Sequence, residues 1–250
     1  MPNQITKSIK DFYNYKANEF STSRNLMWGG YKRIWDDTLN LELPANSYVL
    51  DLGCGNGRLA EFIHNRCKAT INYLGIDLSK ELLIAAESKL SKLANANFIY
   101  KLAEADLTEL DLLEKLTSKT EYNLINLLAV FHHFPDQESR IKLLNYASKI
   151  LAPKGFLIFT TWNFLSSPTL VDNINLVDAD KFLAEYKLEL KSGDHLISWN
   201  NDKSYFRFAH DFSKLEIKEL LNIPGLKLRE EFTTDGKNAK LNNYYLLQKI

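Results

Sequence analysis

The amino-acid sequence predicts an α/β protein with a doubly wound, largely parallel sheet. Short apolar runs alternate with segments of helical periodicity between residues 48 and 161, and a glycine-rich loop at 53–57 directly follows the first run. A later run, 122–130, is apolar throughout, as expected for a strand that helices cover on both faces. Strands that alternate with helices form βαβ units, and the strands of such units are parallel.

Each expected element has a local signal in the sequence. Aromatic and aliphatic residues occur at mixed helical spacing near the N-terminus, and Ser79 and Asp136 are typical N-caps of later helices. Residues 153–155, Pro-Lys-Gly, predict a turn before the fifth strand. The helices are expected at 5–20, 28–41, 58–67, 80–93 and 137–151, and the strands at 48–52, 70–76, 97–102, 122–130 and 156–161.

The alternation of strands and helices stops after the fifth strand. Residues 163–212 form an irregular stretch that is rich in aromatic residues. A capping box from Ser213 to Glu216 then predicts a helix that ends near Leu221, and residues 226–232 and 243–248 predict a final antiparallel pair of strands. Because no linker is evident, we expect residues 1–250 to form a single domain with an insertion at 163–212.

The composition excludes several classes of protein. The chain has 250 residues, 45% of them hydrophobic, and its 31 basic and 31 acidic residues give no net charge that would attract it to nucleic acid or membrane. No apolar run approaches the roughly 20 residues of a membrane span, and the N-terminus lacks the apolar core of a signal peptide. Two cysteines, Cys54 and Cys67, make neither a disulfide framework nor a zinc site, which favours the cytoplasm.

The glycine-rich loop predicts a site for a nucleotide-like ligand. It leaves a strand and opens a helix, where glycines let backbone amides approach a ligand closely. The dinucleotide fingerprint would place its third glycine at position 58, but that residue is Arg58, and the third glycine here is Gly57. Asp51 precedes the loop, and an acid there suits a cationic ligand such as S-adenosylmethionine better than a pyrophosphate. A plain turn between strand and helix is the alternative.

The pattern Asp51-x-Gly53-x-Gly55-x-Gly57 resembles the first motif of class I S-adenosylmethionine-dependent methyltransferases, and the resemblance covers nearly the whole chain. It implies a Rossmann-like methyltransferase fold with seven strands, the last antiparallel, and with the N-terminal helices of residues 1–41 covering the cofactor. It also implies that Asp77 holds the ribose hydroxyls, that Leu78 packs on the adenine and that Asp106 accepts from its exocyclic amine. The expected cofactor-binding residues are Asp51, Gly53, Cys54, Gly55, Gly57, Asp77, Leu78, Ala105, Asp106 and Leu128.

Cys54 and the pair His132 and His133 are better explained as structural residues than as a nucleophile and a metal site. Cys54 is interpreted as a small residue that fills the loop, because no activating base is near it in the sequence. His132 and His133 could suggest a metal site, but adjacent side chains diverge and no third ligand stands at metal-binding spacing. We therefore predict no metal site.

The flanking segments resemble one subgroup, the tRNA wobble-uridine 5-carboxymethyl methyltransferases. The resemblance is carried by Tyr15-x-x-Asn18-x-Phe20-Ser21-x-x-Arg24-x-x-x-Trp28, by residues 129–134, and by Asp194-x-x-Ile197-x-Trp199 with Tyr205-x-Arg207-x-x-His210-x-Phe212. The sequence departs from the subgroup at Asn123, where an Asp is usual, and at Ser198, where a Pro is usual. It has neither the Asn/Asp-Pro-Pro-Tyr/Phe motif of amine methylation nor a Pro-Cys nucleophile.

The chemistry that this resemblance implies is esterification of a carboxymethyl group. A carboxylate, with a pKa near ~4, is already a nucleophile at neutral pH and needs no general base. Arg24 and Arg207 are the candidates to orient the anionic acceptor, and His133 and His210 are the candidate hydrogen bonders. Trp28, Trp162 and Trp199 are expected to wall the site, with the insertion on the substrate side. For each residue the alternative is an ordinary surface charge or core position.

Three functions follow from this reasoning: a tRNA wobble-uridine methyltransferase, a small-molecule O- or C-methyltransferase, and a non-enzymatic binding module. Residues 1–40 hold six basic and four acidic residues, and residues 181–250 hold twelve and ten, so neither end is strongly basic. A tRNA substrate would therefore require a local basic patch or a partner protein. The resemblance implies a small zinc-binding activator that shields an apolar sheet edge.

Overall fold

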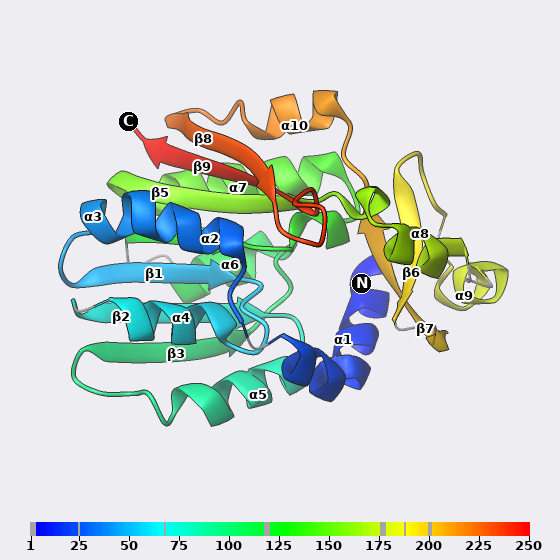
Figure 1. The fold of residues 1–250 in the computed structure, drawn as a ribbon, viewed down its shortest axis with the longest axis horizontal. Coiled ribbons are helices and arrows are strands. Elements are labelled where there is room, and N and C mark those ends of the chain that lie inside the picture. Colours follow the sequence, from blue (N-terminus) through cyan, green and yellow to red (C-terminus); the bar gives the residue numbers. More distant parts are fainter. Residues whose placement is uncertain are drawn as a thin grey trace.

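The computed structural model describes residues 4–24, 26–67, 69–117, 121–175, 179–187, 189–199 and 202–250. Its centre is a seven-stranded sheet with the order β3-β2-β1-β4-β5-β9-β8 (Figure 1). The first five strands run parallel, whereas β9 runs antiparallel to both β5 and β8. The strands are β1 (Ser47–Leu52), β2 (Ile71–Asp77), β3 (Phe98–Glu104), β4 (Tyr122–Leu127), β5 (Leu151–Trp162), β8 (Leu226–Thr234) and β9 (Asn242–Lys249). The predicted doubly wound, seven-stranded fold with an antiparallel last strand is confirmed.

Helices cover both faces of this sheet, because successive strand residues point to opposite sides. On β1, Val49 belongs to the core under one set of helices and Leu50 to the core under the other. In Figure 1, α2 and α4 lie in front of the sheet, and α6 and α7 lie behind it. One layer holds α2 (Gly29–Ile34), the π-helical turn η1 (Trp35–Leu39), α4 (Arg58–Arg66) and α5 (Lys80–Leu90), and the other holds α6 (Leu110–Thr117), α7 (Gln137–Ile150) and α10 (Lys214–Leu220).

The helix starts that the sequence predicts are formed by side-chain caps. Ser79 accepts a hydrogen bond from the Leu82 amide, and Asp136 accepts one from the Ser139 amide. Ser213 and Glu216 form the complete capping box at the start of α10.

Some predicted boundaries were wrong. The fourth strand ends at Leu127, and the chain turns through Ala129, whose φ of 58° lies in the left-handed region. The predicted helix at 28–41 is interrupted by the π-helical turn η1 before the short helix α3 (Asn40–Glu42). Helix α6 was not predicted at all, since it is only eight residues long and buries little more than Leu113 and Thr117.

The insertion is more regular than the sequence predicted. After η3 (Phe164–Ser166), α8 (Pro168–Asn175) and α9 (Ala179–Tyr186), strands β6 (Asp194–Trp199) and β7 (Asp202–His210) form a separate two-stranded sheet. Residues 176–178, 188 and 200–201 of the insertion, and residues 1–3 and 25 of the N-terminal segment, lie outside the described residues.

Helix α1 (Gln4–Ser23) packs between this hairpin and α5 of the main body. Its Ile5 and Ile9 form a small apolar cluster with Leu196, Phe206 and Phe208 of the hairpin. Figure 1 shows α1 and the hairpin side by side, beyond the carboxyl ends of β1 and β3. None of the helices in the described ranges combines the length and apolarity that a membrane crossing needs.

Candidate active site

A cavity of about 330 Å³ lies between the sheet, α1 and the β6–β7 hairpin. Its floor is the glycine-rich loop at the carboxyl end of β1, which is where open α/β sheets bind their ligands. Most of the residues that the sequence singled out line this cavity. They are Arg24, Asp51, Gly53, Cys54, Gly55, Asp77, Leu78, Asp106, Leu128, His133 and Arg207.

The loop is bare of side chains for a steric reason. Gly53 has a φ of 83°, and a Cβ atom on it would lie 2.3 Å from Cγ2 of Val130. The Gly55 amide donates a 2.7 Å hydrogen bond to Oδ2 of Asp77. The backbone of the loop is thereby fixed against the end of β2.

Two predicted cofactor residues do not line the cavity. Gly57 faces α5, and a Cβ atom on it would lie 3.2 Å from that of Ala86. The amide of Ala105 donates to the Asp77 carbonyl, and the residue is buried behind the cavity. Gly57 and Ala105 therefore support the loop and the strand ends, and neither residue lies on the cavity surface.

Three carboxylates meet at the cavity from the ends of three strands. Besides the Gly55 amide, Asp77 accepts from the Ser79 amide through Oδ1, at 2.9 Å. Asp106 accepts from the amide and the hydroxyl of Thr108 through Oδ1, and no described residue bonds its Oδ2. Since a carboxylate has about four acceptor positions, all three acids keep capacity for a ligand.

Asp51 is the most perturbed of these acids. It is 2% exposed, and burial raises its pKa to about 7. A 2.6 Å hydrogen bond from the Tyr73 hydroxyl opposes this shift, the nearby Asp77 adds to it, and Arg58 opposes it. A cationic ligand beside Asp51 would favour its ionised form.

The loop cysteine fits its predicted role as a filler. Cys54 is buried, and burial, with Asp77 and Asp51 nearby, raises the pKa of its thiol well above the ordinary value. A protonated thiol is a poor nucleophile.

Two arginines lie at the opposite end of the cavity, around Trp199. The Cζ atoms of Arg24 and Arg207 each lie 5.3 Å from this ring, and Arg207 also lies 4.5 Å from the ring of Trp162. Arg207 is 6% exposed, and its Nε has no hydrogen-bond partner among the described residues. Burial, then the charge of Arg207, lowers the pKa of Arg24. Within the described part of the chain no carboxylate pairs with either arginine, so this end of the cavity suits an anion.

His133 lines the cavity, but the protein occupies both of its ring nitrogens. Nδ1 lies 2.7 Å from the Phe208 carbonyl, which can only accept, so Nδ1 carries the proton. Nε2 then accepts from the Tyr13 hydroxyl at 2.8 Å. Burial and the charge of Arg207 lower the pKa of His133 to about 3, which keeps the ring neutral.

His210 does not line the cavity, so the structure does not bring it together with Arg24, His133 and Arg207. Its ring lies between two carboxylates, with Nδ1 2.6 Å from Asp194 and Nε2 2.8 Å from Glu216. The expectation that His210 hydrogen-bonds the acceptor does not agree with this position.

The cavity also contains residues that the sequence did not single out as site residues. Tyr13 could have been found, because it stands four residues after Ile9 and seven before Phe20, on one face of α1. Asn242 gave no signal, since it reaches the cavity from the start of β9, far along the chain. Arg58, Asn56 and His132 also belong to this set.

Comparisons with known proteins agree with the motif and the fold. The model of the methyltransferase domain family matches residues 27–231. The tRNA (carboxymethyluridine(34)-5-O)-methyltransferase ALKBH8 of Mus musculus is 27% identical over 156 residues, which are 62% of this chain and 20% of that protein. The ubiquinone biosynthesis O-methyltransferase of Hydrogenovibrio crunogenus is 30% identical over 119 residues, which are 47% of this chain and 44% of that protein.

A solved structure shows the same fold over the whole chain. The magnesium protoporphyrin IX methyltransferase of Synechocystis PCC 6803 superposes with a TM-score of 0.63 at 14% identity, covering 98% of this chain and 100% of that chain. The family match spans more than half of the residues and includes the glycine loop and the three strand-end acids. The chain therefore belongs to the methyltransferase domain family and is an S-adenosylmethionine-dependent methyltransferase.

Proposed function

We propose that the glycine loop and the three strand-end acids hold the cofactor. Asp77 would accept from the ribose hydroxyls, Asp106 through its unused Oδ2 from the adenine amine, and Asp51 would face the cationic methionine end. Leu78 and Leu128 line the same part of the cavity as apolar walls. The N-terminal helix α1 would cover this cofactor, and the insertion would form the acceptor side.

The pKa of Asp51 gives this placement a measurable consequence. Asp51 is neutral below a pH of about 7 in the cofactor-free protein, and the cationic cofactor favours the ionised form, so affinity is expected to fall as the pH falls through about 7. Tyr73→Phe removes a hydrogen bond that lowers this pKa, so the midpoint should move up by about one unit. Calorimetric titrations of both proteins across this pH range measure the shift.

A matched control is available on the neighbouring strand. The Tyr100 hydroxyl bonds Glu87 outside the cavity, so Tyr100→Phe should leave the midpoint where it is in the wild-type protein. The titration of the cofactor itself affects all three proteins equally, so it cancels when their midpoints are compared. An unchanged midpoint in Tyr73→Phe would show that Asp51 does not face the cofactor.

We further propose that the acceptor is a carboxylate, on the carboxymethyl group of a wobble uridine in tRNA. The observation that carries this is the lack of a usable base beside the two arginines. His133 is neutral with its nitrogens occupied, and burial lowers the pKa of His132 well below the ordinary value. An acceptor that must lose a proton would find neither of these histidines, the bases that the described residues place at this end, able to take it, whereas a carboxylate arrives ionised.

The residues at this end would then act by position and charge. Bound S-adenosylmethionine supplies the electrophilic methyl group. Arg207 and Arg24 would hold the acceptor carboxylate so that one oxygen is in line with that group, and Trp162 would help to exclude water. The Nε of Arg207, which no residue in the described part of the chain bonds, would gain a partner from the carboxylate.

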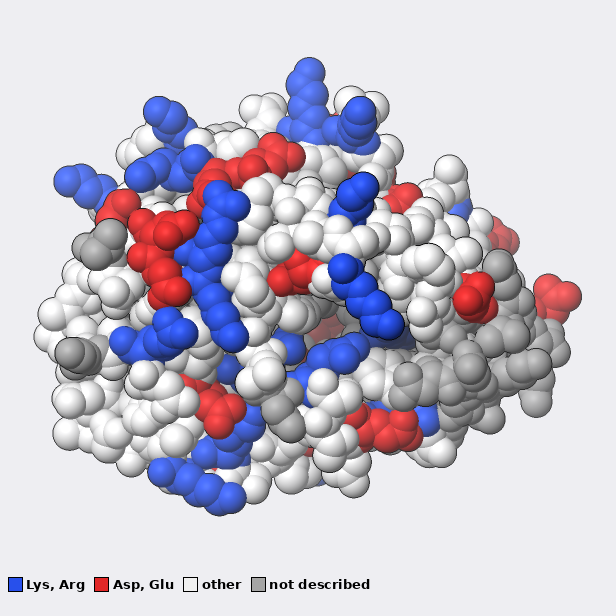
Figure 2. Space-filling view, in the orientation of Figure 1, with Lys and Arg blue, Asp and Glu red and all other residues white. Residues whose placement is uncertain are grey.

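A small-molecule acceptor is the second candidate, and it is favoured by the match to the ubiquinone biosynthesis O-methyltransferase. Figure 2 shows charges of both signs interspersed over one face, with basic side chains beside the central hollow. A tRNA acceptor would thus rely on this limited patch or on a partner. The open edge strand β3, where Ile99 is 50% exposed, is our candidate position for the small zinc-binding activator.

The test is transfer of labelled methyl from S-adenosylmethionine. Label in nucleoside digests of tRNA that carries free carboxymethyluridine, released by mild base as expected for an ester, would support the tRNA function. Label only in small-molecule extracts would favour the second candidate. Cofactor binding without transfer to either would indicate a binding module.

A further inference from the structure

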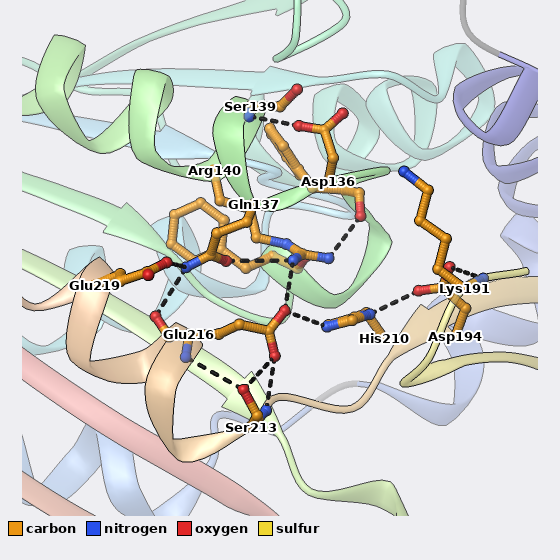
Figure 3. Close-up of polar contacts among 12 residues, drawn as sticks. Asp136, Gln137, Ser139, Arg140, Lys191, Asp194, His210, Ser213, Glu216 and Glu219 are labelled. Carbon is orange, nitrogen blue, oxygen red and sulfur yellow. Dashed lines mark hydrogen bonds and ion pairs between the residues drawn. The ribbon is translucent and has the colours of Figure 1, made fainter.

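His210 belongs to a buried polar cluster that fastens the insertion to the main sheet. It is the last residue of β7, and Figure 3 shows its ring between Asp194, the first residue of β6, and Glu216 of α10. Asp194 also accepts from the Lys191 amide, and Glu216 accepts from the amide and the hydroxyl of Ser213. The cluster thus joins both strands of the hairpin to a helix of the main body.

The contacts of His210 define its protonation. Ionised carboxylates only accept hydrogen bonds, so a ring placed between two ionised carboxylates would donate through both Nδ1 and Nε2. Burial would raise the pKa of Glu216, but the hydrogen bonds from Ser213 and His210 outweigh it and hold this pKa below its ordinary value. Glu216 is therefore ionised, as the argument requires.

Arg140 of α7 links this cluster to the histidines of the cavity. It is 1% exposed, and its Nη1 lies 3.7 Å from Oε1 of Glu216. Its Nε and Nη2 donate to the carbonyls of Phe131 and Phe134, at the two ends of the turn that holds His132 and His133. Arg140 thereby connects the part-buried Glu216 with the turn of the cavity histidines, so one cluster supports both walls of the acceptor end.

The two strands of the hairpin form a sheet of their own, so contacts with α1, α8, the turn of the cavity histidines and this cluster hold the hairpin in place. β7 carries Arg207, and the Phe208 carbonyl of the same strand holds His133. We infer that His210, protonated on both ring nitrogens, is a positioning residue that fixes Arg207 and His133 at the acceptor end of the cavity and does not touch the acceptor. The effect of His210 on the acceptor rests on the proposed acceptor site. The attachment of the hairpin to α10 through His210 does not depend on that proposal.

The protonation is tested directly by NMR of the protein with labelled histidines. At neutral pH, the two ring nitrogens of His210 should both carry protons and both couple to them, unlike those of His133. His210→Gln identifies the resonance. A neutral His210 ring would overturn the inference.

The positioning role is tested by His210→Gln. The glutamine amide can donate to one carboxylate, but its oxygen would then face the other. We expect faster hydrogen exchange at Leu196–Ser198 and Phe206–Phe208, unchanged exchange in the seven-stranded sheet, and a KM for carboxymethyluridine tRNA raised about 10- to 100-fold. The dissociation constant for S-adenosylmethionine should stay within about twofold, since the cofactor end is not attached to this cluster.

Two further variants make the test decisive. His195→Gln changes a histidine of the same hairpin whose ring contacts Phe164 and lies outside the cluster, so it should behave like the wild-type protein. Glu216→Gln preserves the capping box but removes the charge, and it should reproduce the His210→Gln effects if that variant does not fold.

The two proposals fail in different ways. Unchanged exchange in the hairpin, or faster exchange with an unchanged KM, would overturn the positioning role. A wild-type protein that does not methylate tRNA would overturn the proposed function, and the exchange comparison would still decide whether His210 tethers the hairpin.

Discussion

Replacing Asp77 with alanine is expected to weaken the binding of S-adenosylmethionine by at least ~100-fold. Two hydrogen bonds from ribose hydroxyls to a carboxylate are together worth about 3–6 kcal/mol, and every 1.4 kcal/mol is a factor of about ten in affinity. The change also releases the Gly55 and Ser79 amides, which the same carboxylate holds in the structure. The Asp77→Asn protein keeps an acceptor oxygen but loses the charge, so its affinity for S-adenosylmethionine should lie between those of the wild-type and Asp77→Ala proteins. Isothermal titration calorimetry measures all three.

The neighbouring strand offers a control for this prediction. Glu104 pairs with Asp77 in the register of β2 and β3, but it is exposed and does not line the cavity, and its carboxylate accepts a hydrogen bond from Lys10 at the cavity rim. Glu104→Ala should leave the affinity within about twofold, as is usual for surface substitutions. Wild-type affinity in a folded Asp77→Ala protein would contradict the cofactor placement as a whole.

The cofactor half of the site could be predicted because its signals are local. Asp51, Gly53 and Gly55 lie within five residues, and their strand–loop–helix context alone predicts a ligand at that sheet edge. Asp77 and Asp106 follow the next two strands, so the parallel topology brings them to the same edge. What the sequence could not show is that Gly57 and Ala105 face away from the cavity, since this depends on how α5 and β2 pack behind them.

The acceptor half could be predicted only in part, because tertiary contacts determine it. Arg207 and His210 stand three residues apart on one strand, yet one lines the cavity and the other is buried between carboxylates. The role of His133 changes in the same way, since a tyrosine of α1 and a carbonyl of β7 occupy its nitrogens. The spacing of residues along the sequence does not predict these contacts.

Arg207→Lys is expected to lower kcat/KM for the acceptor about 100-fold and to leave the affinity for the cofactor unchanged. Lysine keeps the charge but loses the planar guanidinium that lies beside Trp162 and Trp199, together with the Nε donor that no described residue bonds. The loss should reside mainly in orientation of the acceptor, so it should appear in kcat as well as in KM. Steady-state kinetics with varied tRNA at saturating cofactor measures both parameters.

Two companion variants separate this effect from misfolding and from general electrostatics. Arg229→Lys changes an exposed arginine of β8, paired with Glu42, and should leave the kinetics at the wild-type level.

Arg207→Met removes a buried cation that lies close to Arg24, so it should keep or raise the melting temperature while it abolishes transfer to a carboxylate. A neutral acceptor would gain nothing from the charge of Arg207 and would tolerate the methionine. Retained transfer in Arg207→Met would thus exclude a carboxylate at this end of the cavity, because neither the buried Arg207 nor the half-buried Arg24 pairs with a carboxylate of the described residues, and an anion that the substrate brings would balance their charge.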